Sequence, residues 1–292
     1  MMTVFLVLLA LPLGAALALA AGSYAAFGLA VYRGHNSLFG RACPGQGAAC
    51  LAQGILSAVV AQLVMILTCP LGPLLAPRRR GSPPVPGQPT VVCLHGLYHT
   101  PAAFLAIRPA LARAGYAQVA ILAYRSLGTD FEAEAQRLLA VLRATLAPDA
   151  PLCFLGHSLG GLLARRLAAE PDLARRTRAI VTLGTPHQGS ALAILAVGRL
   201  GRSLRPGSRL LARLAALPDP PGARCTALYS PVDGLVVPDT GLDPGRPGWQ
   251  HVVTPPVAHV AMLYHPATIA LVVAAVGRSL GPNPDRQGEG AS

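Results

Sequence analysis

The sequence predicts an α/β protein, a mostly parallel sheet with helices on both faces, preceded by an N-terminal pair of apolar helices. From residue 90 onward, short apolar runs alternate with longer segments of helical periodicity, which is typical of a parallel sheet covered by helices. The prediction of apolar helices in the N-terminal part begins from the composition of the chain. Of the 292 residues, 52% are hydrophobic and 12% are charged, against about 25% charged residues in an ordinary globular chain. This composition excludes an intrinsically disordered chain and argues against a purely soluble one.

The first apolar segment covers about residues 2–32 and contains no charged side chain. A helix needs about 20 apolar residues to cross the hydrocarbon core of a bilayer, so this segment is long enough. A cleaved signal peptide would normally begin with basic residues. Here the first arginine is Arg33, although Ala18-Leu19-Ala20 resembles a cleavage site. We therefore expect a retained membrane helix, with signal cleavage as the alternative.

A second uncharged segment covers residues 51–75 and predicts a second membrane helix. The alternative is a buried core helix of a soluble domain, for which the segment is long. With the first segment and the short loop 33–50, it predicts a transmembrane hairpin over residues 1–76. Arg78-Arg79-Arg80 follows at once, and clustered arginines favour the cytoplasmic side of a membrane. We expect a bacterial inner-membrane protein whose main domain is cytoplasmic; a periplasmic domain, or one secreted after signal cleavage, is the alternative.

Residues 77–89 are rich in Arg, Pro and Gly and predict a stiff linker, so the domain boundary belongs there. The main domain then covers residues 90–280, and the polar residues 281–292 predict a disordered tail. The six cysteines form no disulfide framework. Only Cys43 and Cys50 share a short polar loop, where they could pair in an oxidising compartment.

Six apolar runs of the main domain predict strands, and one long segment between them has clear helical periodicity. The strands are expected at residues 90–94, 118–124, 152–156, 179–183, 225–229 and 251–254. From 130 to 147, apolar residues recur at three- and four-residue spacing, which makes one face of a helix that Thr129 or Asp130 can cap.

The strongest motif is Gly156-His157-Ser158-Leu159-Gly160-Gly161, which follows an apolar run and opens a helical pattern. Strand, G-x-S-x-G and helix together are the context of a nucleophile elbow, a tight turn whose flanking positions tolerate no bulk. The N-terminus of the following helix directs N–H groups toward Ser158. We predict that Ser158 is a nucleophile; an ordinary Gly-rich turn is the alternative.

The strand at residues 90–94 ends in His95-Gly96-Leu97, upstream of the serine motif. A loop at this place can supply a second backbone donor for the negative oxygen that forms when a carbonyl is attacked. We predict that the N–H groups of Leu97 and Leu159 form this oxyanion hole. His95 is expected to organise the loop and not to act as a base.

An acid is predicted at Asp233, which follows the strand at 225–229 within Pro231-Val232-Asp233-Gly234. A carboxylate just past a strand can reach a histidine and hold its tautomer and orientation. Asp239 and Asp243 are rival candidates, but they lie farther from the strand end.

The base is expected after the acid, in the chain order Ser, Asp, His. His251 lies in a predicted strand, and His265 lies beside Pro266 at the start of the final helix. His259 lies in the loop between them and is best placed to reach the serine, so we predict that His259 is the base.

These residues together resemble the α/β-hydrolase superfamily. GHSLGG at 156–161, the His-Gly strand end, GTPHQGS at 184–190, DGLVVP at 233–238 and VAHVAM at 257–262 occur in the family's order. They are most similar to bacterial triacylglycerol lipases and esterases, over about residues 90–280. The resemblance implies the α/β-hydrolase fold, a Ser–His–Asp triad and the hydrolysis of carboxylic esters. It implies no cofactor, and because the chain lacks an acidic cluster like the calcium site of some of these lipases, we predict no metal.

The resemblance also places His187, in the GTPHQGS segment, at the mouth of the site. We expect it to be either a structural residue or one that lines the substrate, as we expect of His95, Tyr98 and His157. Residues 190–217 form a variable cap, where Gly201 and Pro206-Gly207 are expected to separate two short helices. Five arginines there (199, 202, 205, 209 and 213) alternate with leucines. This pattern indicates either a solvated cap face or a lid that lies on an anionic bilayer.

The sequence therefore predicts a membrane-anchored serine hydrolase that cleaves carboxylic esters, a lipase or esterase, through an acyl-enzyme. Alternatives are a lipid deacylase or acyl-thioesterase with the same triad, and a non-enzymatic hydrolase-fold protein that interacts at the membrane. The expected partners are an ester or lipid substrate and the bilayer, with no protein partner. The net charge of +12 comes from scattered arginines without interleaved aromatics, which argues against a nucleic-acid surface.

Overall fold

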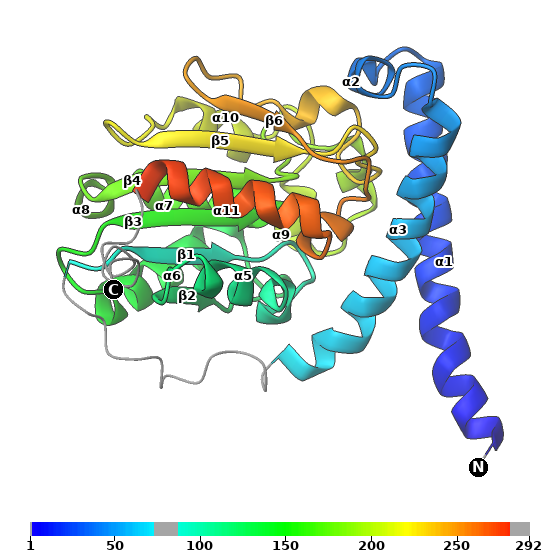
Figure 1. Ribbon diagram of the computed structural model, residues 1–292, viewed down its shortest axis with the longest axis horizontal. Coiled ribbons are helices and arrows are strands. Elements are labelled where there is room, and N and C mark those ends of the chain that lie inside the picture. Colours follow the sequence, from blue (N-terminus) through cyan, green and yellow to red (C-terminus); the bar gives the residue numbers. More distant parts are fainter. Residues whose placement is uncertain (1, 73–86, 281–292) are drawn as a thin grey trace, which may run out of the picture.

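Six parallel strands form one sheet in the computed structural model, which describes residues 2–72 and 87–280 (Figure 1). The strand order is β2-β1-β3-β4-β5-β6, and all five neighbouring pairs are parallel. The strands are β1 (Thr90–Leu94), β2 (Val119–Leu122), β3 (Leu152–His157), β4 (Thr177–Leu183), β5 (Arg224–Tyr229) and β6 (Gln250–Val253). Each predicted strand is present with ends that differ by at most two residues, so the predicted α/β fold is confirmed.

The two faces of the sheet pack against different helices. Val91 and Cys93 of β1 share an apolar cluster with α5 (Ile107–Arg113) and α11 (Pro266–Leu280). Their neighbours Val92 and Leu94 instead share a cluster with α6 and α7. Because side chains alternate between the faces of a strand, a strand covered on both faces is apolar at every position, which explains the unbroken apolar runs.

The helices on that second face are α6 (Phe131–Thr145) and α7 (Leu159–Ala168). Asp130 caps α6, since its side chain accepts the N–H of Ala133 at 3.0 Å, so of the two predicted caps the aspartate is the one used. The short elements of the main domain are η2 (Pro101–Phe104), α8 (Pro171–Ala174), η4 (Asp239–Leu242) and η5 (Ala261–Leu263).

The N-terminal residues form a hairpin of two long helices, α1 (Met2–Tyr32) and α3 (Gly47–Thr68), joined through α2 (Ser37–Ala42). The first matches the predicted segment. The second begins four residues before the predicted 51–75 and ends earlier, where η1 (Cys69–Leu71) follows, because Pro70 lacks the N–H that a continuing helix requires. Cys43 and Cys50 are both free thiols, and Cys50 belongs to α3 instead of to a loop.

The hairpin lies beside the main domain, along the edge where the strands end (Figure 1). Tyr24 and Phe27 of α1 and Ala58 of α3 belong to the same apolar cluster as residues of β3 and α11. The hairpin and main domain are therefore packed together. The sequence analysis, which placed a domain boundary at the linker, did not predict this contact. Most of that linker, at 77–86, and the predicted tail at 281–292 lie outside the described residues.

The cap contains three short elements: η3 (Ala191–Leu195), α9 (Gly198–Arg202) and α10 (Arg209–Ala216). The five cap arginines are exposed, and four leucines (200, 204, 211 and 214) are buried, as the alternating pattern predicts. Gly201 does not separate two helices, since it lies inside α9. A Cβ there would lie 2.7 Å from Ala196 and 3.0 Å from the Tyr98 hydroxyl, so Gly201 allows a close approach instead of a break.

Candidate active site

The candidate site lies where the strand order reverses, between β1 and β3, which is where ligands bind in open α/β sheets. The loop after β1 and the turn after β3 meet there. A Cβ on Gly96 would lie 3.2 Å from the Cβ of Ser158 and 3.0 Å from Nδ1 of His157. The loop predicted to supply an oxyanion donor therefore contacts the predicted nucleophile directly.

Ser158 occupies a strained turn between β3 and α7. Its φ of 54° and ψ of −126° are rare for a residue with a side chain and cost about 1–3 kcal/mol. The surrounding backbone holds this conformation: the N–H of Ser158 donates to the carbonyl of Leu183 at 2.8 Å. A Cβ on Gly160 would lie 2.0 Å from the carbonyl oxygen of Leu94, so the turn requires glycine there.

Asp233 and His259 form a buried, hydrogen-bonded pair. Nδ1 of His259 lies 2.7 Å from Oδ2 of Asp233, and both residues are less than 5% exposed. The other carboxylate oxygen, Oδ1, accepts the N–H groups of Leu235 at 2.9 Å and Val236 at 3.0 Å. The aspartate is thus fixed by three hydrogen bonds and fixes the histidine ring in turn.

The rival candidates lie elsewhere. Asp239 accepts the N–H of Leu38 in the hairpin, and Asp243 accepts the N–H of Gly245 near the surface. His251 contacts the hydroxyl of Tyr229 on β5, and His265 precedes α11. Of the predicted acids and bases, the structure brings only Asp233 and His259 together.

The N–H groups of Leu97 and Leu159 make no backbone hydrogen bond within the described chain. Leu97 borders the cavity beside Ser158, and Leu159 is the first residue of α7. Both donors therefore remain free for an oxygen next to Ser158.

His157 supports the loop that carries His259. Its Nε2 lies 3.0 Å from the carbonyl oxygen of His259, and because a carbonyl only accepts, this nitrogen carries the proton. Burial, together with the nearby His259, holds the pKa of His157 well below its usual range, so the ring is neutral. His157 also borders the cavity.

Tyr98 likewise borders the cavity, and its hydroxyl donates to the carbonyl of Val197 in the cap at 2.5 Å. His95 does not border it. The His95 ring is fully buried and stacks on Tyr124 with 4.0 Å between ring centroids, and burial lowers its pKa to about 4. Its role is to hold the loop, and its predicted place along the substrate is corrected.

His187 is also displaced from its predicted place at the mouth of the site. Its ring is buried, with Nδ1 lying 3.2 Å from Arg165 and Nε2 lying 3.2 Å from the hydroxyl of Thr182 on β4. Its ring packs edge-on against Trp249. Burial and the positive charge of Arg165 keep the pKa of His187 well below normal, so it is a neutral structural residue.

A cavity of about 430 Å³ opens beside Ser158 and His259 and is lined mainly by apolar side chains. One wall comes from the cap and another from the hairpin, through Ala18, Leu19, Gly22, Ser23, Gln62 and Met65. Sequence reasoning missed the hairpin wall. Gln62 is a polar residue of the second apolar segment, but Gln53 is another, so the sequence did not single it out. His99, with a pKa lowered to about 4 by burial, borders the cavity as well and was also missed.

Residues 91–282, about two thirds of the chain, match the sequence profile of the alpha/beta hydrolase family. The chain belongs to this family, and the resemblance inferred from its motifs is confirmed. The hairpin lies outside the matched residues.

Individual relatives are more distant. Mouse protein SERAC1 is 38% identical over 63 residues, covering 19% of this chain and 10% of that protein, so the match spans only a tenth of its length. The mature lipase BlEst2 of Bacillus licheniformis is 15% identical with a TM-score of 0.51, over 66% of this chain and 95% of that one. The lin2722 product of Listeria innocua is 12% identical with a TM-score of 0.50, over 65% and 94%. At these identities the similarity concerns the fold.

Proposed function

We propose that this protein is a membrane-attached serine hydrolase that cleaves carboxylic esters, a lipase or esterase. Ser158 is the nucleophile, His259 the general base and Asp233 the residue that orients the base. The observation that carries the proposal is the position of Ser158, on a strained turn at a cavity that the hydrogen-bonded His259–Asp233 pair also borders. Membership of a hydrolase family supports the same chemistry.

The reaction proceeds through an acyl-enzyme. His259 accepts the hydroxyl proton of Ser158 while the serine oxygen attacks the ester carbonyl, and the N–H groups of Leu97 and Leu159 hold the resulting oxyanion. The intermediate collapses, and His259 gives its proton to the departing alcohol. Water, deprotonated by His259, then attacks the acyl carbonyl and releases the carboxylic acid and the free serine.

The apolar lining of the cavity favours a substrate with an apolar acyl group. A deacylase or acyl-thioesterase would use the same residues in the same steps. The choice among these activities depends on the alcohol or thiol that leaves.

Membrane attachment is supported by the hairpin. Its segments Ala10–Tyr32 and Gly47–Thr68 are long and apolar enough to cross a bilayer. Arg78-Arg79-Arg80, directly after the hairpin in sequence, favours a cytoplasmic catalytic domain. C-terminal fusions to green fluorescent protein and to alkaline phosphatase test this side. We expect the green fluorescent protein fusion to fluoresce and the alkaline phosphatase fusion to be inactive. A dark fluorescent fusion with an active phosphatase would overturn the orientation.

A fluorophosphonate probe tests the chemistry. We expect covalent labelling of the wild-type protein and hydrolysis of p-nitrophenyl butyrate, both lost in Ser158→Ala. Ser203→Ala is the matched control, because this cap serine bonds only within the cap and lies away from the cavity. A wild-type protein that neither reacts nor turns over ester would refute the enzyme and favour a non-enzymatic membrane protein with a hydrolase fold.

A further inference from the structure

We propose that the N-terminal hairpin is part of the substrate-binding site, and that Gln62 binds a hydroxyl group on the alcohol part of the ester. The preferred substrate is then an acyl ester of a hydroxyl-bearing alcohol such as glycerol. This inference rests on the proposed function, because it concerns the substrate of the same Ser158 site.

The hairpin supplies one wall of the cavity beside the proposed triad. Leu19 and Gly22 of α1 and Met65 of α3 border it, all from outside the region that defines the family. A Cβ on Gly22 would meet no other atom within 4 Å, so a larger side chain there has open space to enter. Because Gly22 borders the cavity, we expect a larger side chain at this position to reduce the room left for an acyl chain.

Two hydrogen bonds tie this wall to the loops of the triad. The hydroxyl of Tyr24 in α1 donates to the carbonyl of Val232, the residue before Asp233, at 2.8 Å. The hydroxyl oxygen of Ser57 in α3 accepts the N–H of Ala258, the residue before His259, at 2.9 Å. The wall thus has a fixed position relative to the reacting groups.

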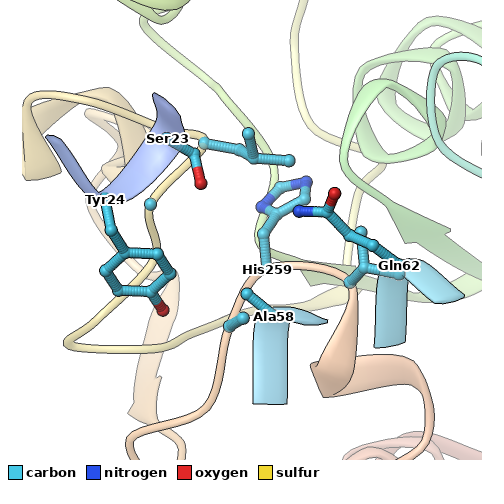
Figure 2. Close-up of a pocket in the computed structure, with 9 residues that line it drawn as sticks. Ser23, Tyr24, Ala58, Gln62 and His259 are labelled. Carbon is cyan, nitrogen blue, oxygen red and sulfur yellow. The ribbon is translucent and has the colours of Figure 1, made fainter. Parts of the chain in front are cut away.

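Gln62 is the polar group on this wall. It is 5% exposed, and its Oε1 has no hydrogen-bond partner among the described residues. With Ser23 and His259 it also borders a recess of about 10 Å³, and Figure 2 shows its amide beside the His259 ring. A buried amide oxygen without a donor is costly, so a ligand that supplies the donor is favoured.

The position next to His259 identifies which part of the ester Gln62 would meet. His259 delivers its proton to the departing alcohol, so the alcohol lies on the His259 side of the reacting carbonyl. A hydroxyl both donates and accepts and can therefore bond to either atom of the amide. A simple alkyl ester has no such group.

The first experiment compares glyceryl monobutyrate with ethyl butyrate, which share one acyl group. We expect the ratio of their kcat/KM values to fall about tenfold in Gln62→Leu and to stay within about twofold of wild type in Gln53→Leu. Gln53 lies on the exposed face of the same helix. An unchanged ratio in Gln62→Leu would overturn the role of Gln62.

The second experiment compares p-nitrophenyl palmitate with p-nitrophenyl butyrate. We expect the palmitate-to-butyrate ratio of kcat/KM to fall about tenfold or more in Gly22→Leu and to stay near wild type in Gly28→Leu, since Gly28 is exposed on α1 away from the cavity. If the wild type is active and the two variants have equal palmitate-to-butyrate ratios, the role of the hairpin in acyl-chain binding would be refuted while the proposed function would stand. A wild type without turnover or fluorophosphonate labelling would overturn the proposed function and this inference together.

Discussion

The hairpin and the catalytic domain differ in where many of their large apolar side chains lie. The catalytic domain encloses large apolar side chains, such as Phe104 and Phe154, and exposes the five cap arginines. The hairpin buries Tyr24 and Phe27 together with small residues such as Ala20 and Ala58, and leaves several large apolar residues exposed. Leu11, Leu17, Leu56, Val60 and Leu67 are each 50% exposed or more. Large apolar side chains on the outer face are typical of helices in lipid, which supports the proposed membrane attachment of the hairpin.

The largest expected effect tests whether the chemistry belongs wholly to the catalytic domain. Asp233→Asn and His259→Ala should each lower kcat by about 10³- to 10⁴-fold, because the histidine loses its orientation or is removed. His251→Ala and His265→Ala should remain near wild type. The rates are measured with p-nitrophenyl butyrate, and a larger loss from His265→Ala than from His259→Ala would show that the base is wrongly assigned.

Acid should separate the two regions. His95 and His99 are neutral in the folded protein, with pKa values lowered to about 4 by burial, against about 6.5 when unfolded. Their contribution is therefore fully present above pH 6.5 and is lost as the pH falls toward 4, by about 3 kcal/mol for each residue. Residues 1–89 contain no Asp or Glu and only one His, so acid should not unfold the hairpin.

The single tryptophan, Trp249, lies in the catalytic domain and reports its unfolding by fluorescence. Circular dichroism follows the helices of both regions. We expect the melting temperature reported by Trp249 fluorescence to decrease as the pH is lowered from 7 to 5. Helical circular dichroism from the hairpin should persist at temperatures above that melting temperature. A midpoint independent of pH would contradict the buried, neutral histidines.

Glycines should behave differently in the two regions. Gly160→Ala places a Cβ 2.0 Å from the Leu94 carbonyl, a backbone atom that cannot move aside, and should cost about 3 kcal/mol. Gly28→Ala meets no atom within 4 Å and should cost nothing, since alanine favours a helix by up to about 1 kcal/mol. Equal thermal midpoints for the two variants would refute the distinction.

The smallest effect concerns the contact between the regions. Tyr24→Phe removes the donor to the Val232 carbonyl and should cost about 1 kcal/mol of stability, with a fall in kcat of less than about tenfold. Tyr32→Phe, on the exposed end of the same helix, is the control. Indistinguishable kinetics and melting of both variants would indicate that the hairpin is uncoupled from the triad loops.

The sequence predicts those parts of the molecule whose local geometry restricts the residue type. The turn at Ser158 admits only glycine at position 160, so its motif is readable. The loop position of His259, between a predicted strand and the final helix, separates it from His251 and His265. The direction of a side chain is not encoded locally. The GTPHQGS segment indicates where the backbone of His187 passes, but its ring turns toward Arg165 and Trp249, away from the cavity.

The docking of the hairpin is harder still to predict. Residues 2–32 are apolar on every side, so periodicity does not show which face packs against protein. Tyr24 and Ser57 find their partners more than 200 residues away in the chain, at Val232 and Ala258. Such pairs depend on the tertiary arrangement alone.

The bonds from Tyr24 and Ser57 also impose an order on the maturation of the protein. Ribosomes make residues 1–72 first, and the loops that carry Asp233 and His259 are among the last to emerge. Those loops then settle against helices that are already in place. A protein cut near Ala18-Leu19-Ala20 would keep both residues, whereas one produced without its first 89 residues would lose both bonds. We therefore expect the proposed hydrolytic activity to be lower in molecules that lack the hairpin.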